Sequence, residues 1–329
     1  MYGYVMQTAV LPYGQPYFRE LEDKKHEFGF IDFYCEFYVK KNKFPCMQIK
    51  NNIMYAGLEN VYLKESNGIT HLHMTTLDYE IFKAHYDIEN DYGYGYVTFQ
   101  ARDDMLRDVI QTNIDEKTYW SNRKHYDPYR RTKAKDNTNM LYGSFGLNPL
   151  SDAVKPFIND NGIISMKHET ELRDYRYIPI ASAITSRARA ITIGAIDANY
   201  DNWVYSDTDS MYLTKPAKGI KCDDTVSGCW KCEGAEDNRT YRHGKFLRQK
   251  CYILADENYI PYHSVDKYGN VEYKIKCAGM PDKVKESVSW ENMQIGTTFH
   301  KLQHCLVKGG VCLVDMPYTL GNIKRGLNQ

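Results

Sequence analysis

The sequence lacks any apolar run that approaches the ~20 residues of a membrane-spanning helix, and its mean hydropathy is −0.60. No positively charged segment followed by an apolar stretch opens the chain, so we expect a cytoplasmic protein with no membrane partner. The nine cysteines lack the paired spacing of a disulfide framework, which indicates reduced thiols. Net charge is also absent, because 42 basic and 42 acidic side chains balance. Any binding of nucleic acid must therefore depend on local basic patches.

The chain is long enough to bury a sizeable core. Its 329 residues predict about two domains at ~150 residues each. With 26% charged and 43% hydrophobic residues, it is not a disordered protein. The 29 tyrosines could stack on bases or could reflect an AT-rich genome, and their number does not decide between the two.

Strands and helices come in runs, not in strict alternation, which indicates an α+β fold. Residues 29–39 read as a strand, and Asn161-Gly162 between two apolar stretches predicts a hairpin. A second hairpin is expected to turn near residues 268–270. Helical spacing of apolar residues predicts helices near 75–86, 102–120, 128–146 and 184–195.

Two aspartates, Asp207 and Asp209, lie in the segment Tyr205–Ser210 between two apolar stretches. We expect a hairpin with both carboxylates at its tip. Carboxylates this close repel unless a proton or a cation lies between them, and Mg²⁺ prefers carboxylate and phosphate oxygens. Taken alone, the pattern favours an ordinary acidic turn, because Asp and Thr are common turn residues. An EF-hand is excluded, because Met211 and Tyr212 stand where an oxygen ligand and a glycine belong.

The helix expected at 128–146 carries a polar face. At 100° per residue, four of its side chains span about 80° of the helix surface; they are Arg131, Lys135, Asn139 and Tyr142. Two cations, an amide and a ring in line suit a triphosphate followed by a base. A solvated basic face is the alternative, but the far side offers no clean apolar stripe to bury, so we favour a binding role.

The segment Arg248–Tyr252 reads as a strand. Phe246, Arg248, Lys250 and Tyr252 would then share one face, with Leu247, Cys251 and Ile253 on the other. Cations interleaved with aromatic rings suit a nucleic-acid backbone, and an exposed face of long side chains is equally compatible with the pattern.

A zinc site is a weaker interpretation of Cys222, Cys229, Cys232 and His243. The spacing of Cys229 and Cys232 fits, but no second cysteine pair follows and only one histidine does. Free thiols are the better interpretation.

Together these motifs resemble the family B DNA polymerases, most closely their protein-primed branch from phages and linear plasmids. The YxDTDS motif of that branch matches Tyr205–Ser210, and its KxY motif matches Lys250 and Tyr252. Its KxxxNSxYG motif matches Lys135, Asn139, Tyr142 and Gly143, with Met140 in place of serine. Further blocks extend the similarity over nearly the whole chain.

The resemblance implies a right-hand polymerase fold with palm, fingers and thumb and two insertions specific to the branch. The expected segments are the end of a first palm segment (1–10), a terminal-protein-binding insertion (11–111), fingers (112–146), a second insertion for processivity and strand displacement (147–177), palm (178–276) and thumb (277–329).

The resemblance also implies a role for individual residues. Asp209 would be the principal ligand, and Asp207 a supporting ligand, of two Mg²⁺ or Mn²⁺ ions that serve nucleotidyl transfer. Residues implied to bind the incoming dNTP are Tyr2, Arg123, Arg131, Lys135, Asn139 and Tyr142. Residues implied to bind primer-template DNA are Gly143, Thr208, Arg248, Lys250 and Tyr252. A terminal protein would act as the primer.

The first palm motif of the branch, DxxSLYP, is matched only from Tyr2, with Gly3 in place of the proline. Its aspartate would precede Met1, as would an exonuclease domain. We therefore expect a fragment that is weakly active or inactive without its amino-terminal portion. The alternatives are a non-catalytic module that binds DNA or terminal protein, and, more remotely, a DxD glycosyltransferase.

Overall fold

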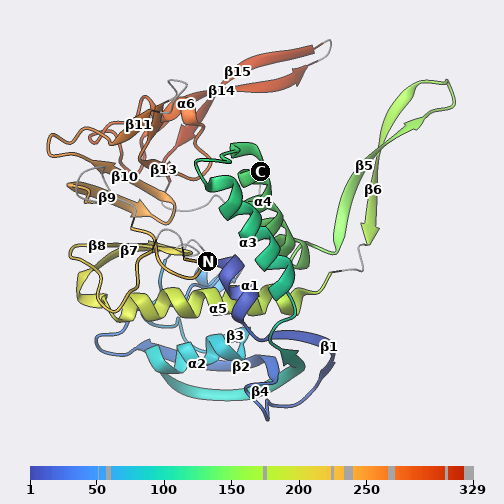
Figure 1. The fold of residues 1–329 in the computed structure, drawn as a ribbon, viewed down its shortest axis with the longest axis vertical. Helices are drawn as coiled ribbons and strands as arrows, with labels where there is room; N and C mark the ends of the chain where they lie inside the picture. Colours follow the sequence, from blue (N-terminus) through green and yellow to red (C-terminus); the bar gives the residue numbers. More distant parts are fainter. Residues whose placement is uncertain are drawn as a thin grey trace. The chain divides into compact units, whose positions relative to one another are not determined.

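The computed structural model describes residues 1–50, 52–56, 61–172, 176–223, 226–232, 240–265, 271–307 and 310–321; its ribbon is drawn in Figure 1. The chain forms two compact units. The first comprises residues 1–40 and 68–194, and the second comprises residues 41–67 and 195–329. Residues 41–67 thus belong with the carboxy-terminal part of the chain, although they lie inside the expected 11–111 segment. The six-segment division stays a prediction.

The first unit contains a four-stranded antiparallel sheet in the order β1-β4-β2-β3. Its strands are β1 (Leu11–Tyr17), β2 (Glu27–Val39), β3 (Thr70–Thr75) and β4 (Tyr86–Arg102). The strand expected at 29–39 is confirmed as part of β2. Alternation buries Phe33 and Phe37 on one face of β2, against Phe82 of helix α2 (Thr76–His85). Helix α2 begins where its expected cap, Thr75, accepts a hydrogen bond from the Asp78 amide.

Four further helices complete the first unit: α1 (Tyr2–Thr8), α3 (Arg107–Ser121), α4 (Pro128–Phe145) and α5 (Ile178–Asp197), whose last turn passes into the second unit. The three helices expected at 102–120, 128–146 and 184–195 are confirmed. Helix α5 lies between the sheet and the helices α3 and α4 (Figure 1). Its buried face meets α1, α3, β1 and β2 in one apolar core of Ile180, Ala183, Ile184, Ala188, Val5, Ile110, Leu11 and Phe28.

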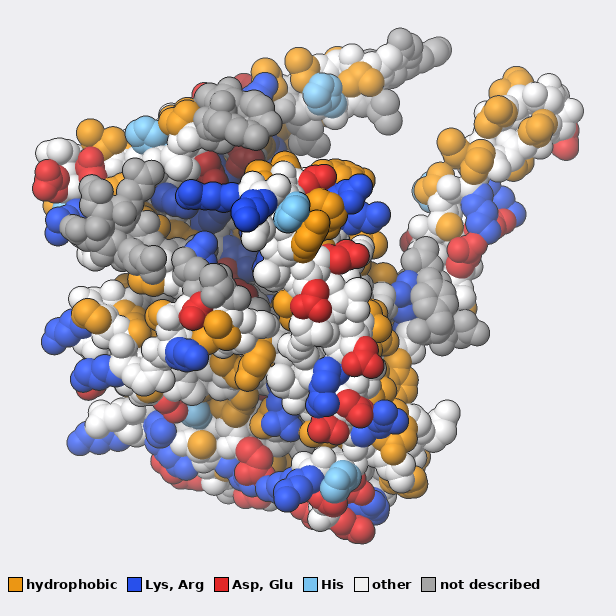
Figure 2. All heavy atoms as spheres, in the orientation of Figure 1, with side chains coloured by type: hydrophobic (Ala, Val, Ile, Leu, Met, Phe, Trp, Pro, Cys, Tyr) orange, Lys and Arg blue, Asp and Glu red, His pale blue; other side chains and the backbone are white. Residues whose placement is uncertain are grey.

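The hairpin expected around Asn161-Gly162 is confirmed as β5 (Leu150–Ile158) paired with β6 (Ile164–Leu172). The Asn159 side chain accepts hydrogen bonds from the amides of Asn161 and Ile163, and Gly162 has a φ of +73°. Hydrophobic side chains, orange in Figure 2, lie exposed along this hairpin.

The second unit is rich in short strands. Strands β7 (Trp203–Asp207) and β8 (Ser210–Leu213) form a hairpin. Further along the chain, three strands form a sheet in the order β13-β10-β9. The remaining strands pair as β11–β12 and β14–β15. Their bounds are β9 (His243–Arg248), β10 (Cys251–Ala255), β11 (His263–Val265), β12 (Val271–Tyr273), β13 (Ile275–Cys277), β14 (Thr298–Val307) and β15 (Gly310–Thr319), with α6 at Asp282–Lys285.

Strands β11 and β12 pair as the expected second hairpin requires, while its turn at residues 268–270 lies outside the described residues. None of the helices in the described parts of the chain has both the length and the apolar character needed to cross a bilayer.

The packing of α5 predicts a stability difference between two positions on one helix. Ile184→Ala, at a side chain with no exposed surface, should lower the free energy of unfolding by about 2–5 kcal/mol. Ile178→Ala, at a residue that is 50% exposed, should change it by less than about 1 kcal/mol. Urea unfolding followed by circular dichroism measures both, and equal losses would contradict the assigned core.

Candidate active site

The expected aspartate hairpin is present in the second unit. Strands β7 and β8 pair Asp207 directly with Ser210, which leaves Thr208 and Asp209 as the turn. Thr208 has a φ of +50°, and its hydroxyl donates a hydrogen bond to Asp207 Oδ1 at 3.0 Å. Asp207 is half-buried and Asp209 is exposed. The turn therefore presents one carboxylate to solvent and holds the other against the protein.

The interpretation of Arg248–Tyr252 as one strand is wrong. Strands β9 and β10 form a hairpin in which Arg248 pairs with Cys251, so Gln249 and Lys250 make the turn. Lys250 has a φ of +55°, a left-handed conformation that non-glycine residues seldom adopt outside turns. Phe246 and Tyr252 still face each other across the hairpin, as expected for one sheet face, but Lys250 lies at the tip.

The two hairpin turns meet through Lys250. Its ammonium lies 2.9 Å from Asp207 Oδ1 and 2.7 Å from Oδ2, and its backbone amide donates to the Tyr205 hydroxyl at 2.8 Å. The Asp207 side chain is 20% exposed and the Lys250 side chain 58%. One cation therefore neutralises the less exposed carboxylate and leaves Asp209 as the open oxygen donor.

Aromatic side chains of the same strands pack next to the two turns. Tyr205 stacks on Phe246 with ring centroids 4.8 Å apart, and Tyr212 donates from its hydroxyl to that of Tyr252 at 3.2 Å. Burial raises the pKa of Tyr205 to about 12, and burial also raises the pKa values of Tyr252 and of nearby Tyr62. These phenols thus stay protonated and neutral at physiological pH.

Contacts of two residues at the site, Gln249 and Arg248, were not anticipated from sequence. Gln249 donates from its amide to the Tyr62 hydroxyl at 3.0 Å, which ties the β9–β10 turn to the 41–67 segment. Arg248, expected to contact DNA, donates from Nε to the Gly321 carbonyl at 2.7 Å and from Nη1 to the Gln249 carbonyl at 3.2 Å. No local pattern marks Tyr62, because its partner lies 187 residues away.

The basic helix face is built as expected in the first unit. Helix α4 begins after Asp127, whose carboxylate accepts from the Arg130 amide at 3.0 Å, and Pro128 occupies its first turn. Arg131 donates from Nε to the Ser121 hydroxyl at 3.2 Å. Lys135 and Asn139 are exposed, as is Arg123 in the loop that joins α3 to α4.

Tyr142, at the end of this face, is held by the fold. Its ring stacks on Tyr2 with centroids 4.3 Å apart and planes 21° from parallel, and its hydroxyl is hydrogen-bonded to the Thr185 hydroxyl at 3.0 Å. A Cβ at Gly3 would lie 3.2 Å from the methyl group of Thr138, so Gly3 lets α1 approach α4 closely. The structure thus brings together two predicted nucleotide-binding tyrosines that are far apart in sequence.

Two groups of side chains in the sequence are candidate metal ligands. In the described part of the chain, Cys222, Cys229, Cys232 and His243 do not gather into a ligand set. Nor does a third His, Cys, Asp or Glu join Asp207 and Asp209 closely enough to form one. Two carboxylates at one turn fit the oxygen preference of Mg²⁺, with water and substrate oxygens completing its shell.

Burial of the Tyr205 phenol predicts a pH dependence of stability. Because its pKa is raised from 10 to about 12, the unfolded state loses this proton first as pH rises, and stability should fall between about pH 10 and pH 12. Tyr205→Phe should reduce the slope of the free energy of unfolding against pH by the equivalent of up to one proton. Urea midpoints across this pH range measure the slope, with Tyr259→Phe, at an exposed tyrosine, as control; equal slopes in Tyr205→Phe and wild type would contradict the assignment.

A model of the family described as DNA polymerase type B, organellar and viral, matches residues 1–227. The chain is 33% identical to the DNA polymerase of Bacillus phage phi29, covering 97% of this chain and 56% of the phage protein. It is 30% identical to that of Streptococcus phage Cp-1, covering 97% and 55%.

Solved structures of phi29 DNA polymerase are also similar to this chain. The phi29 polymerase in a ternary complex with primer-template DNA and incoming nucleotide matches with a TM-score of 0.80 at 33% identity, and its complex with single-stranded DNA matches with 0.76 at 32%. Both cover 97% of this chain and 56% of the phage chain, so the chain spans about half the length of these relatives. The fold is that of a polymerase, and the resemblance found in the sequence is confirmed. The chain belongs to the type B DNA polymerases of organelles and viruses.

Proposed function

We propose that this chain is the polymerase portion of a protein-primed DNA polymerase, which transfers a nucleotide from dNTP to a primer hydroxyl under the direction of a template. The observation that carries this proposal is the contact of Lys250 with Asp207 at 2.7 Å, which joins two motif-bearing turns beside exposed Asp209. The relatives whose structures contain primer-template DNA and incoming nucleotide support it.

The α4 face is the proposed dNTP site. Arg131, Lys135 and, from the preceding loop, Arg123 supply positive charge for a triphosphate, since cations placed at transferring phosphate stabilise the charge that develops there. In the part of the chain that the structure describes, no carboxylate lies within ion-pair distance of Lys135, so its charge is available to a ligand. Asn139 adds an amide to this face, and the stacked pair Tyr2–Tyr142 offers a rigid aromatic surface for base and sugar.

Asp209 and Asp207 are the proposed ligands of Mg²⁺ or Mn²⁺. Two bound ions would activate the primer hydroxyl and neutralise the leaving pyrophosphate. Lys250 holds Asp207 in place and limits the repulsion between the two carboxylates. We propose that a further carboxylate comes from polypeptide outside these 329 residues, because the described residues place no third one beside the pair.

The likeness to the phage polymerases suggests the roles of the remaining residues and segments. Lys250, Tyr252, Thr208, Arg248 and Gly143 are the proposed contacts of primer-template DNA. Residues 11–111 would bind the terminal protein, and 147–177, which includes the β5–β6 hairpin, would support processivity. We further propose that 112–146, 178–276 and 277–329 act as fingers, palm and thumb, and that replication takes place in the host cytoplasm.

The test is primer extension with Mg²⁺ by this chain, alone and with an amino-terminal extension that carries the aspartate of the first palm motif. Synthesis only with the extension would support the proposal. Synthesis by the chain alone would show that another carboxylate completes the site. DNA binding without synthesis in either form would favour a non-catalytic binding module, which also fits the lack of a third carboxylate beside the pair among the described residues.

Asp209→Asn in the extended protein should lower the rate of nucleotide addition by roughly a hundredfold or more and leave DNA affinity nearly unchanged. Removing the negative charge weakens metal binding without altering side-chain shape. Steady-state kinetics and a gel-shift titration measure the two effects, with Asp201→Asn, at an exposed aspartate before β7, as the matched control. Undiminished turnover in Asp209→Asn would remove this carboxylate from the mechanism.

Lys135→Ala should raise the KM for dNTP and lower kcat, reducing kcat/KM by roughly tenfold to a hundredfold, because the ammonium neutralises transferring phosphate. Lys133→Ala removes an equal charge from an exposed position on another face of α4 and should have little effect. Single-nucleotide incorporation at varied dNTP concentration separates the two constants. A change confined to DNA affinity would instead assign this helix face to the nucleic-acid backbone.

A further inference from the structure

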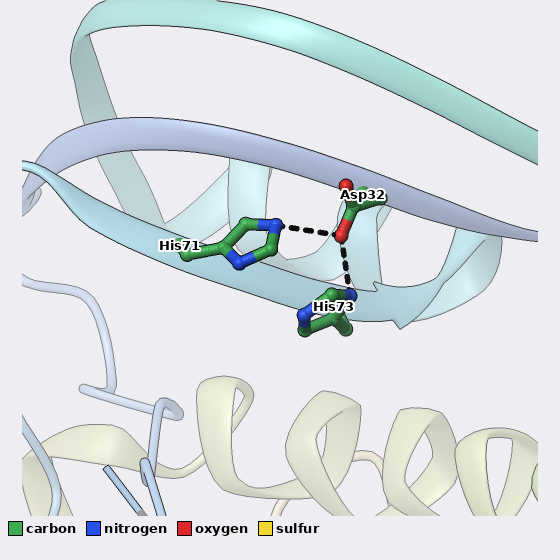
Figure 3. A group of neighbouring side chains, drawn as sticks. All are labelled: Asp32, His71 and His73. Atoms are coloured by element: carbon green, nitrogen blue, oxygen red, sulfur yellow. Dashed lines mark ion pairs between the residues drawn. The ribbon is translucent and has the colours of Figure 1, made fainter.

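A second group of metal-ligating side chains lies on the sheet of the first unit. Asp32 of β2 is paired directly with His73 of β3, and His71 is paired with Tyr34, two residues along the same face. Because side chains two apart on a strand share a face, all three polar groups project from one side of the sheet. Figure 3 shows both imidazole rings turned toward one carboxylate oxygen.

The ligand atoms converge closely. His71 Nε2 lies 2.8 Å from Asp32 Oδ1, His73 Nδ1 contacts the same oxygen, and all three atoms lie within 4.8 Å of one another. Asp32 Oδ1 and His71 Nε2 are both buried, yet neither makes a contact with the geometry of a hydrogen bond. A buried oxygen and a buried nitrogen without hydrogen bonds are costly, and one ion coordinated by both would satisfy them.

Neighbouring groups hold these ligands and leave the group open to solvent. The His71 ring stacks on Tyr34 with centroids 4.2 Å apart and planes 5° from parallel, which fixes its orientation. Gly95, opposite Asp32 on β4, adds no side chain beside the carboxylate. The His73 side chain is 69% exposed, so an ion can reach the group from solvent.

We propose that Asp32, His71 and His73 bind a divalent transition metal of the Zn²⁺ class, with water at the remaining position. Two imidazoles and one carboxylate suit Zn²⁺ or Co²⁺, whereas Mg²⁺ prefers oxygen ligands alone. Tetrahedral bonds of about 2.0–2.1 Å place ligand atoms roughly 3.3 Å apart, so the Asp32–His71 contact would open by about 0.5 Å. The ion would cross-link β2 to β3 and stabilise the sheet, independently of the proposed polymerase chemistry.

The experiment is titration of the full chain with Zn²⁺ in competition with a weak chromophoric chelator, in the presence of excess Mg²⁺. We expect one Zn²⁺ per chain. His73→Ala and Asp32→Asn should each weaken binding at least tenfold, and their folding is checked by circular dichroism. The control is His300→Gln, which alters a His–Asp pair on β14 and β15 whose 3.0 Å contact offers only two ligands.

Co²⁺ substitution identifies the donor atoms. We expect weak visible bands from nitrogen and oxygen ligands without the near-ultraviolet charge transfer of a thiolate. Absence of tight Zn²⁺ binding to the wild-type chain would overturn the proposal and leave an Asp–His ion cluster. Full Zn²⁺ binding in His73→Ala, together with its loss in the double variant Cys229→Ser, Cys232→Ser, would overturn it in favour of the thiols.

Discussion

Burial of one face of α5 is the constraint on which the first unit depends. Ile180, Ile184 and the small side chains of Ala183 and Ala188 fill the space between sheet and helices, where each large apolar side chain contributes about 1.5–3 kcal/mol. Once this face is buried, polar residues of the same helix have fixed places. Thr185 bonds the Tyr142 hydroxyl at 3.0 Å, and the rigid tyrosine stack at the end of the basic face is a consequence of core packing.

The candidate site in the second unit is built on two turns with unusual backbones. Thr208 and Lys250 both adopt the left-handed conformation that most side chains avoid, at φ values of +50° and +55°. The bidentate contact of Lys250 with Asp207 and the hydrogen bond from its amide to Tyr205 stabilise both turns. Strained residues held by such contacts concentrate at functional sites, which agrees with the role proposed for Asp207, Asp209 and Lys250.

The chain presents two donor sets with different chemical preferences. Asp207 and Asp209 offer oxygen atoms alone, which suit a hard cation that keeps water and phosphate in its shell. Asp32, His71 and His73 add two imidazole nitrogens, which suit a transition metal. Ligand type therefore distinguishes the two proposed sites.

Features specified by neighbouring residues could be predicted from the sequence. Asp127-Pro128 marks the start of α4, Asn161-Gly162 marks a hairpin, and the aspartates of 207–209 lie at a turn, because caps and turns are local. Nothing in Gln249-Lys250 marks the turn between β9 and β10, so a strand was expected there. The Tyr2–Tyr142 stack and the meeting of Asp32 with His71 and His73 required the tertiary structure, because strand register and helix packing alone bring such distant residues into contact.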